Sequence, residues 1–376
     1  MPHDADIIII GAGVVGLAVA AEVASEDRDV YVLEKNETFG LETSSRHSGV
    51  IHSGMYYPKG SLKARLCVAG NRMLYRLCEK YGIGYKRLGK LVVATSEEET
   101  EELKVLIEKG RINGTEGLRI LSEGELRELE PNVKGTAAIL SPTTGIIDSH
   151  ALMQYYITKA MDGRAQIAYK TKAVGIDKVA DGYNVTVEDE TGISSLTTGI
   201  LINCAGLYCD KVAELAGINI EEAGYILHYC KGEYFSLSSS KGKLVKRLIY
   251  PVPTPHFTSL GIHLAPDLEG RVRLGPGAEY VDSIDYAMDD RNQKFFLNAV
   301  KRYLPFIEYD DLAPEMAGIR PKLQEPGGEV RDFVIRYEGD KGLPGLINLI
   351  GIESPGLTAS PAIAEYVGGL VNELLA

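Results

Sequence analysis

Residues 7–16, with the sequence IIIIGAGVVG, constrain the fold more than any other part of the chain. Four consecutive isoleucines are typical of a strand buried on both faces, because β-branched side chains without polar alternation suit a fully covered sheet. The pattern G-x-G-x-x-G follows, then an apolar stretch expected to be a helix, a second short strand at residues 30–33 and the acid Glu34. This order predicts a dinucleotide-binding βαβ unit.

Each glycine of the pattern has a separate mechanical role. Gly11 allows the tight turn, Gly13 lets the backbone approach a pyrophosphate, and Gly16 lets the helix pack close to the sheet. The N–H groups at the helix N-terminus favour a bound phosphate. Glu34 follows Gly16 by 18 residues and is placed to accept hydrogen bonds from ribose hydroxyls. NAD and FAD both use this pattern, so it does not decide between them.

Composition excludes several other classes of protein. A length of 376 residues indicates about two domains, and a net charge of −12 argues against a nucleic-acid partner bound on a broad basic face. The five cysteines form no C-x-x-C pair, so free thiols in a reducing compartment and no metal site are expected. The leader MPHDAD lacks basic residues, and no apolar window of about 18 residues predicts a membrane span. We expect a cytoplasmic protein, with loose membrane association left open.

Two more junctions of a strand, a glycine and a helix occur at residues 199–215 and at residues 346–375, where the closing helix is expected from Pro361. Junctions at the start, middle and end of the chain predict one α/β domain with a Rossmann-like parallel sheet, built from residues 1–85, 146–220 and 318–376. The intervening segments contain short alternating strands and turns. We expect residues 86–145 and 221–317 to form a substrate-binding domain with an antiparallel sheet, making the chain α+β overall.

Further segments occur in order across most of the chain: HSGVIHSGMYYPKGSLKARLC (47–67), GKLVVAT (89–95), CAGLYCD (204–210), KGEYFSL (231–237), IYPVP (249–253), LGIHL (260–264) and AGIRP (317–321). On these segments the chain resembles FAD-dependent oxidoreductases of the D-amino-acid-oxidase superfamily, and within it the L-2-hydroxyglutarate dehydrogenase/oxidase family. The match at GVIHSG and YYPKGSLKA is specific to that family. Residues 353–358 (ESPGLT) depart from it and are nearer to amino-acid oxidase relatives.

The resemblance implies an FAD cofactor and the residues that hold it. The pyrophosphate would lie at residues 11–16, the ribose at Glu34, the adenine at the backbone of Val174, and the flavin along residues 43–48 and 351–358. The expected cofactor-binding residues are Gly11, Gly13, Val14, Val15, Gly16, Glu34, Lys35, Thr43, Ser44, Ser45, Arg46, His47, Ser48, Val174, Ala205, Gly206, Leu207, Gly318, Arg320, Gly351, Ser354, Pro355, Gly356, Leu357 and Thr358.

Oxidation of a 2-hydroxy acid by a flavin needs an anchor for the carboxylate and a base for the hydroxyl proton. Arg320 is the expected anchor, since its planar fork matches a carboxylate, although a salt bridge at a domain junction is the alternative. His52 is the expected base, because histidine titrates near neutral pH. His263 is the second candidate for the base. Its alternative interpretation is a core histidine that is hydrogen-bonded to the backbone. Tyr250 is the fourth candidate catalytic residue.

Other polar residues receive a structural interpretation. Tyr57, like Tyr250, could line the pocket, or its ring could pack against other residues while its hydroxyl remains in solvent. Lys63 falls on an expected helix and is interpreted as a solvated side chain rather than a second carboxylate-binding group. Glu233 is expected to pair with Lys231 or Lys246 and to have no catalytic role.

The leading hypothesis is an FAD-dependent enzyme that transfers a hydride from C2 of a small L-2-hydroxy acid to flavin N5, with L-2-hydroxyglutarate and 2-oxoglutarate as the leading pair. The alternatives are an amine or amino-acid oxidase of the glycine, sarcosine or D-amino-acid type, a non-catalytic flavin-binding protein, and a nicotinamide enzyme. The expected partner is a small-molecule carboxylate substrate. The electron acceptor stays open between oxygen, a quinone and an electron carrier.

Overall fold

The computed structural model describes residues 3–253 and 260–376. The N-terminal strand lies inside a sheet whose central strands are parallel and run in the order β20, β12, β1, β2 and β9. These strands are β1 (Ala5–Ile10), β2 (Val30–Leu33), β9 (Gln166–Ala168), β12 (Gly192–Asn203) and β20 (Leu346–Ile350). Antiparallel strands extend it, namely β10 (Lys172–Val179) and β11 (Gly182–Asp189) beyond β12, and β19 (Val334–Tyr337) beside β20.

The isoleucine run fills two separate cores. Ile7 and Ile9 belong to the core under the helices on one face, whereas Ile8 and Ile10 belong to the core on the other face. Strand side chains alternate between faces, so four adjacent isoleucines require cover on both sides. The expectation of a doubly covered strand in a Rossmann-like α/β domain is therefore confirmed.

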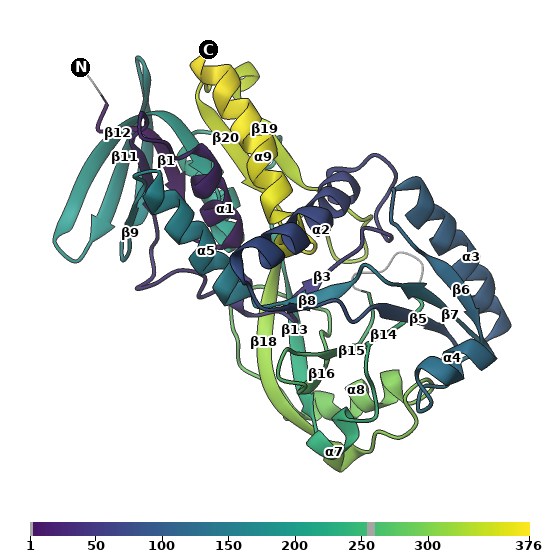
Figure 1. The fold of residues 1–376 in the computed structure, drawn as a ribbon. Coiled ribbons are helices and arrows are strands. Elements are labelled where there is room, and N and C mark those ends of the chain that lie inside the picture. Colours follow the sequence, from purple (N-terminus) through teal and green to yellow (C-terminus); the bar gives the residue numbers. More distant parts are fainter. Residues whose placement is uncertain (1–2, 254–259) are drawn as a thin grey trace.

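Helices from distant parts of the chain cover this sheet (Figure 1). On one face α1 packs against both α5 and α9, and α2 packs against α9. On the other face α6 contacts β10 and β20. The helices are α1 (Val14–Val23), α2 (Leu62–Tyr81), α5 (Ser149–Asp162), α6 (Cys209–Leu215) and α9 (Gly356–Leu375).

A second large sheet occupies the other half of the molecule (Figure 1). Its strands are β5 (Lys90–Ala94), β6 (Arg119–Ser122), β7 (Ala137–Ser141), β13 (His228–Leu237), β14 (Leu248–Pro251), β15 (His263–Pro266), β16 (Val272–Gly275), β17 (Glu279–Val281) and β18 (Leu312–Lys322). Neighbouring strands are antiparallel except β14 and β5, which are parallel. β5 lies far upstream of β14 in the sequence, so no hairpin connects the two strands and their pairing can be parallel. The expectation of an antiparallel sheet is therefore wrong at this one pair.

The remaining elements border this second sheet or connect the two halves. The helices α3 (Glu97–Ile112), α4 (Glu123–Leu129), α7 (Ser239–Gly242) and α8 (Gln293–Val300) lie around it (Figure 1). A small sheet of β3 (Val50–Ile51), β8 (Gly145–Ile147) and β4 (Tyr85–Lys86) lies between the halves. No helix in the described parts of the chain is long and apolar enough to cross a membrane.

The closing helix α9 begins at Gly356 and contains Pro361, so the expected start at Pro361 is wrong. A proline inside a helix removes one backbone hydrogen bond. Close packing of the first turn of α9 offsets this loss, because a Cβ on Gly70 of α2 would lie only 2.1 Å from the Thr358 carbonyl oxygen. The helix N-terminus is thereby fixed next to the loop that carries residues 352–355.

Candidate active site

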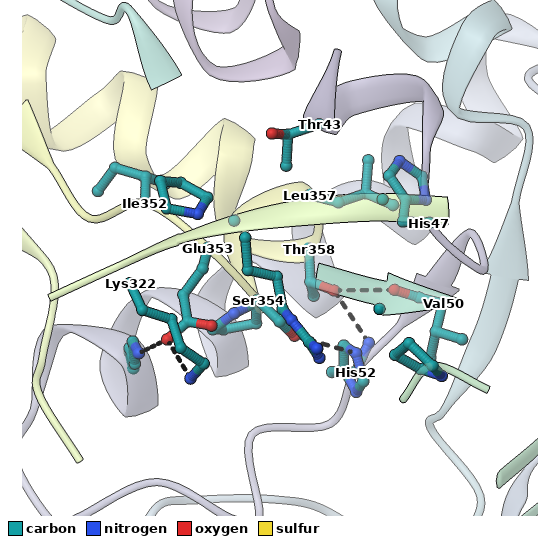
Figure 2. Close-up of a pocket in the computed structure, with 18 of the residues that line it drawn as sticks. Thr43, His47, Val50, His52, Lys322, Ile352, Glu353, Ser354, Leu357 and Thr358 are labelled. Atoms are coloured by element: carbon teal, nitrogen blue, oxygen red, sulfur yellow. Dashed lines mark hydrogen bonds and ion pairs between the residues drawn. The ribbon is translucent and has the colours of Figure 1, made fainter. Parts of the chain in front are cut away.

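One pocket brings together segments from the start, middle and end of the chain. Its wall includes residues 13–16 at the start of α1, residues 43–44 and 46–50 of the following loop, residues 318–322 of β18, and residues 352–358 at the start of α9. Figure 2 shows side chains of the last three of these segments facing one another across the pocket. The strand–glycine–helix junctions at the two ends of the chain therefore open into one cavity.

The glycine loop has the close packing that a dinucleotide site requires. Gly11 has a φ of +107°, and a Cβ there would lie 2.5 Å from the Cys204 carbonyl oxygen. A Cβ on Gly16 would lie 2.0 Å from the Gly11 carbonyl oxygen, whereas one on Gly13 would meet only the Ser44 hydroxyl, at 3.1 Å. Gly13 is the N-cap of α1 and has no side chain to cap it. The Val14 N–H donates to the Ser44 hydroxyl at 3.0 Å, and the N–H groups of Val15 and Gly16 are available to a phosphate.

The Glu34 carboxylate lies beside the glycine loop and is almost fully buried. Its Oε2 atom accepts from the Ala12 N–H at 2.9 Å, and its Oε1 atom accepts from the N–H and the side-chain amide of Asn36 at 2.9 and 2.8 Å. A carboxylate has about four lone-pair positions, so one acceptor position remains for a ribose hydroxyl.

The structure places most of the expected cofactor residues on the pocket wall. The wall includes Gly13, Val14, Val15, Gly16, Thr43, Ser44, Arg46, His47, Ser48, Gly206, Gly318, Arg320, Ser354, Pro355, Gly356, Leu357 and Thr358. The pocket wall does not include Gly11, Glu34, Lys35, Ser45, Val174, Ala205, Leu207 or Gly351.

Two of the residues outside the wall have other partners. Lys35 pairs with Glu42 at 2.6 Å, and the Ser45 hydroxyl donates to the Gly40 carbonyl oxygen. The loop itself is fixed by His47, whose Nε2 donates to the Ser44 carbonyl oxygen at 2.8 Å while Nδ1 accepts from the Gly49 N–H at 2.9 Å. Burial lowers the pKa of His47 to about 4, so both bonds form with a neutral ring.

His52 follows β3 and is held by its backbone on both sides. Its N–H donates to the Thr358 hydroxyl at 2.9 Å, and its carbonyl oxygen accepts from the Asn71 side chain at 2.8 Å. In the ring, Nε2 lies 3.5 Å from the Ser354 hydroxyl, while Nδ1 is buried without a hydrogen-bond partner among the described residues (Figure 2). Burial, together with the charge of Lys90, holds the pKa of His52 well below its usual range, so the ring is neutral at pH 7.

His263 and Tyr250 form a stacked pair in the same wall, with ring centroids 3.7 Å apart. The Nδ1 of His263 donates to the Gly261 carbonyl oxygen at 2.9 Å, which leaves Nε2 as an acceptor. That Nε2 and the Tyr250 hydroxyl are buried and have no hydrogen-bond partner within residues 3–253 and 260–376. Burial lowers the pKa of His263 to about 3. Buried unsatisfied polar atoms on a pocket wall are expected where a ligand completes the bonding.

Arg320 lies on β18 with its guanidinium partly held by backbone. Its Nε atom donates to the Cys230 carbonyl oxygen at 3.3 Å, and its Nη2 atom donates to the Gly277 carbonyl oxygen at 2.6 Å. These bonds fix the group on the pocket wall. The Nη1 atom has no bond to the described part of the chain and is therefore the nitrogen best placed for a substrate carboxylate.

The interpretation of Lys63 as a solvated residue is wrong, since only 4% of it is exposed. Its Nζ lies 2.9 Å from the Oε1 atom of Glu353, and the Nζ of Lys322 lies 3.1 Å from that same oxygen (Figure 2). Burial would raise the pKa of Glu353, but the two ammonium groups outweigh it and hold the pKa at about 2. Sequence reasoning missed Lys322 and Glu353, although Lys322 stands only two residues after Arg320 on the same strand.

The expected pairing of Glu233 with Lys231 or Lys246 is also wrong. Glu233 accepts from the Asp289 N–H at 2.9 Å and from the Asn292 amide at 2.6 Å, while Lys231 donates to the Ala287 carbonyl oxygen. Glu233 therefore holds the segment before α8. Tyr57, by contrast, is buried on the pocket wall.

The model of the FAD dependent oxidoreductase family (DAO) matches residues 6–370. The chain belongs to this family. Its fingerprint therefore serves FAD, and the nicotinamide alternative is excluded. The chain is 37% identical over 400 residues to a mitochondrial L-2-hydroxyglutarate dehydrogenase of Arabidopsis thaliana, covering 96% of this chain and 82% of the relative. It is 33% identical to an L-2-hydroxyglutarate dehydrogenase of Indibacter alkaliphilus, covering 98% of both.

A solved structure shares the whole architecture. The dithionite-reduced L-alpha-glycerophosphate oxidase of Mycoplasma pneumoniae with FAD bound has a TM-score of 0.87 and 29% identity, covering 98% of this chain and 94% of that one. The residues described above fit FAD. Gly13 and the first turn of α1 lie on the pocket wall without a side chain over the backbone, and the Glu34 carboxylate beside the glycine loop keeps one acceptor position. The family membership and the pocket together establish an FAD-dependent oxidoreductase.

Proposed function

We propose that the protein oxidises a small L-2-hydroxy acid to the 2-oxo acid, with L-2-hydroxyglutarate as the leading substrate and 2-oxoglutarate as its product. The observation that carries this proposal is the neutral His52 in the same pocket as Arg320 and the FAD-binding segments. An alcohol needs a base as its hydrogen leaves C2, and an unprotonated imidazole meets that need. The L-2-hydroxyglutarate dehydrogenases at 37% and 33% identity support this substrate.

Bound FAD supplies the acceptor for the two electrons. Arg320 binds the C1 carboxylate through Nη1 while the backbone carbonyls hold the rest of its guanidinium. His52 takes the hydroxyl proton at Nε2, the ring atom that reaches toward Ser354. The His52 backbone donates to the Thr358 hydroxyl and accepts from the Asn71 side chain, and these bonds keep the residue in place as the charge of its imidazole changes. The Tyr250 hydroxyl offers a donor to a substrate oxygen, and the Nε2 atom of His263 offers an acceptor to a substrate hydroxyl.

A second candidate is oxidation of the C2 hydroxyl of a glycerol phosphate. The structural likeness to the Mycoplasma oxidase at 29% identity favours it. The chemistry at C2 is the same, so His52 has the same role. The two candidates differ at both ends of the substrate. The hydroxy acid carries a carboxylate next to C2 and a second carboxylate at its far end, whereas the glycerol phosphate carries a hydroxymethyl group next to C2 and a phosphate at its far end.

We also propose a division of the chain into two domains and a cellular location for the protein. Residues 1–85, 146–220 and 318–376 would form the FAD-binding domain, and residues 86–145 and 221–317 the substrate-binding domain. The membership of the two large sheets supports this division except at β18, which crosses the boundary at residue 318 and pairs with β13 of the second sheet along its length. The five cysteines are free and buried, which supports a reducing compartment such as the cytoplasm.

Steady-state turnover with an artificial electron-accepting dye tests the proposed reaction. The holoprotein should oxidise L-2-hydroxyglutarate to 2-oxoglutarate faster than glycerol 3-phosphate, lactate, glycine or sarcosine. His52→Ala should lower turnover by about 10²-fold or more, the usual contribution of a general base. Turnover of glycine or sarcosine that survives His52→Ala would contradict the proposal, since an amine with a free lone pair needs no such base.

A further inference from the structure

Two buried lysines share one carboxylate oxygen at the pocket wall. The Lys63 Nζ and the Lys322 Nζ lie 2.9 and 3.1 Å from Glu353 Oε1, and the three side chains are 5%, 6% and 8% exposed. They come from α2, from the end of β18 and from the segment before α9. Three distant segments thus converge on one small cluster.

The cluster carries an excess of positive charge. Two ammonium groups face one carboxylate, and the other hydrogen-bond partner of Lys322 is the neutral amide of Gln324, at 3.3 Å. The carboxylate of Asp332 caps the start of α2, accepting the backbone N–H groups of Leu62 and Lys63 at 2.6 and 2.9 Å, and within the described residues it makes no ion pair with either ammonium group. A buried charge without a partner is costly, so an excess of one cation favours a further anion.

The cluster adjoins the two groups that handle the reacting end of the substrate. Arg320 and Lys322 are two residues apart on β18, so their side chains leave the same face of the sheet. Glu353 precedes Ser354, whose hydroxyl lies 3.5 Å from His52 Nε2. All of these residues line the same pocket. A substrate carboxylate on Arg320 leaves the charge of the lysine cluster unpaired.

We propose that Lys63 and Lys322, bridged by Glu353, bind an anionic group at the end of the substrate remote from C2. This site makes the enzyme selective for substrates with two anionic ends or with a phosphate. This anion site rests on the proposed function only because that function identifies C2 as the reacting carbon. The anion is the distal carboxylate of a dicarboxylate or the phosphate of a phosphomonoester, since either accepts from two ammonium groups.

Binding of non-reacting acids to the holoprotein tests the site without turnover. Glutarate and pentanoate have equal chain lengths and differ in the second carboxylate, and each perturbs the flavin absorbance when it binds near the ring. Wild type should bind glutarate at least about tenfold more tightly than pentanoate. Lys322→Met and Lys63→Met should remove this preference while leaving pentanoate binding within about twofold. Lys322→Arg should keep part of it.

Lys104→Met, on the exposed face of α3, is the matched control and should change neither affinity. If the methionine variants lose flavin, wild type alone still decides, because equal binding of the two acids overturns the proposal. A fall in the flavin reduction potential with an unchanged preference for glutarate also overturns it. The methionine variants can lose the preference for glutarate even if the wild-type holoprotein does not oxidise L-2-hydroxyglutarate. That combination would support the anion site and reject the proposed substrate. Relative turnover of glycerol 3-phosphate and L-2-hydroxyglutarate then distinguishes phosphate from carboxylate.

Discussion

The backbone N–H of His52 donates to the hydroxyl of Thr358 at 2.9 Å, and the same hydroxyl donates to the Val50 carbonyl oxygen at 3.2 Å. Thr358 lies in the first turn of α9 and is fully buried. The proposed base is therefore fixed to the first turn of α9, which lines the pocket. His52 and Thr358 are separated by 306 positions in the sequence, so their contact depends on the tertiary fold.

Thr358→Val should separate the base from α9. Valine has nearly the same shape but leaves the His52 N–H and the Val50 carbonyl oxygen unpaired, which costs about 1–3 kcal/mol of stability. We expect turnover to fall by about tenfold as the imidazole loses its fixed position. Thr358→Ser keeps the hydroxyl and should restore both turnover and melting temperature. Equal impairment of the serine and valine variants would show that the methyl group, not the hydrogen bonds, is what matters.

Gly13→Ala should release FAD while leaving the fold intact. The added Cβ would meet only the Ser44 hydroxyl, at 3.1 Å, so the chain can accommodate it by a small shift. The methyl group would stand where the backbone must approach the pyrophosphate. Flavin content after purification and the melting temperature of the protein measure the two effects.

Gly369→Ala is the matched control for that change. It lies on the exposed face of α9 with nothing within 4 Å of the added Cβ, and it should retain FAD. Alanine should also stabilise the helix by up to about 1 kcal/mol. Full flavin content in Gly13→Ala would place the pyrophosphate away from this loop.

Lys90→Met should shift the acid limb of the pH profile upward. Lys90 is fully buried, and its Nζ lies 4.3 Å from the Tyr56 ring centroid and 4.7 Å from that of Tyr250. Burial lowers its pKa to about 7, so it is charged at acid pH, where its charge helps to depress the pKa of His52. Removal of this charge raises the pKa of His52, and the base is then protonated at a higher pH.

The pH dependence of kcat/KM for the wild type and for Lys90→Met measures this shift. Lys104→Met again serves as the exposed control. An acid limb that stays in place, or that moves to lower pH, would mean that Lys90 does not act on the base.

The sequence predicted the parts of the site that depend on local pattern. The four isoleucines, the glycine spacing and Glu34 give the βαβ unit because their roles follow from strand alternation and turn geometry. Lys63 was misjudged for the opposite reason: its partner Glu353 lies 290 residues away, and helical periodicity does not reveal which loop covers a side chain. The start of α9 was placed too late because packing against Gly70 overrides the local effect of Pro361.

Flavin bleaching in the absence of oxygen separates oxidation of L-2-hydroxyglutarate from oxidation of an amine in a single turnover. The holoprotein is mixed anaerobically with L-2-hydroxyglutarate, and the visible flavin absorbance and the 2-oxoglutarate formed are both measured. If His52 serves a hydroxy-acid oxidation, the absorbance is lost with about one 2-oxoglutarate formed per flavin, and His52→Ala slows this loss. If L-2-hydroxyglutarate leaves the absorbance unchanged while glycine or sarcosine bleaches it, the protein is not a hydroxy-acid dehydrogenase.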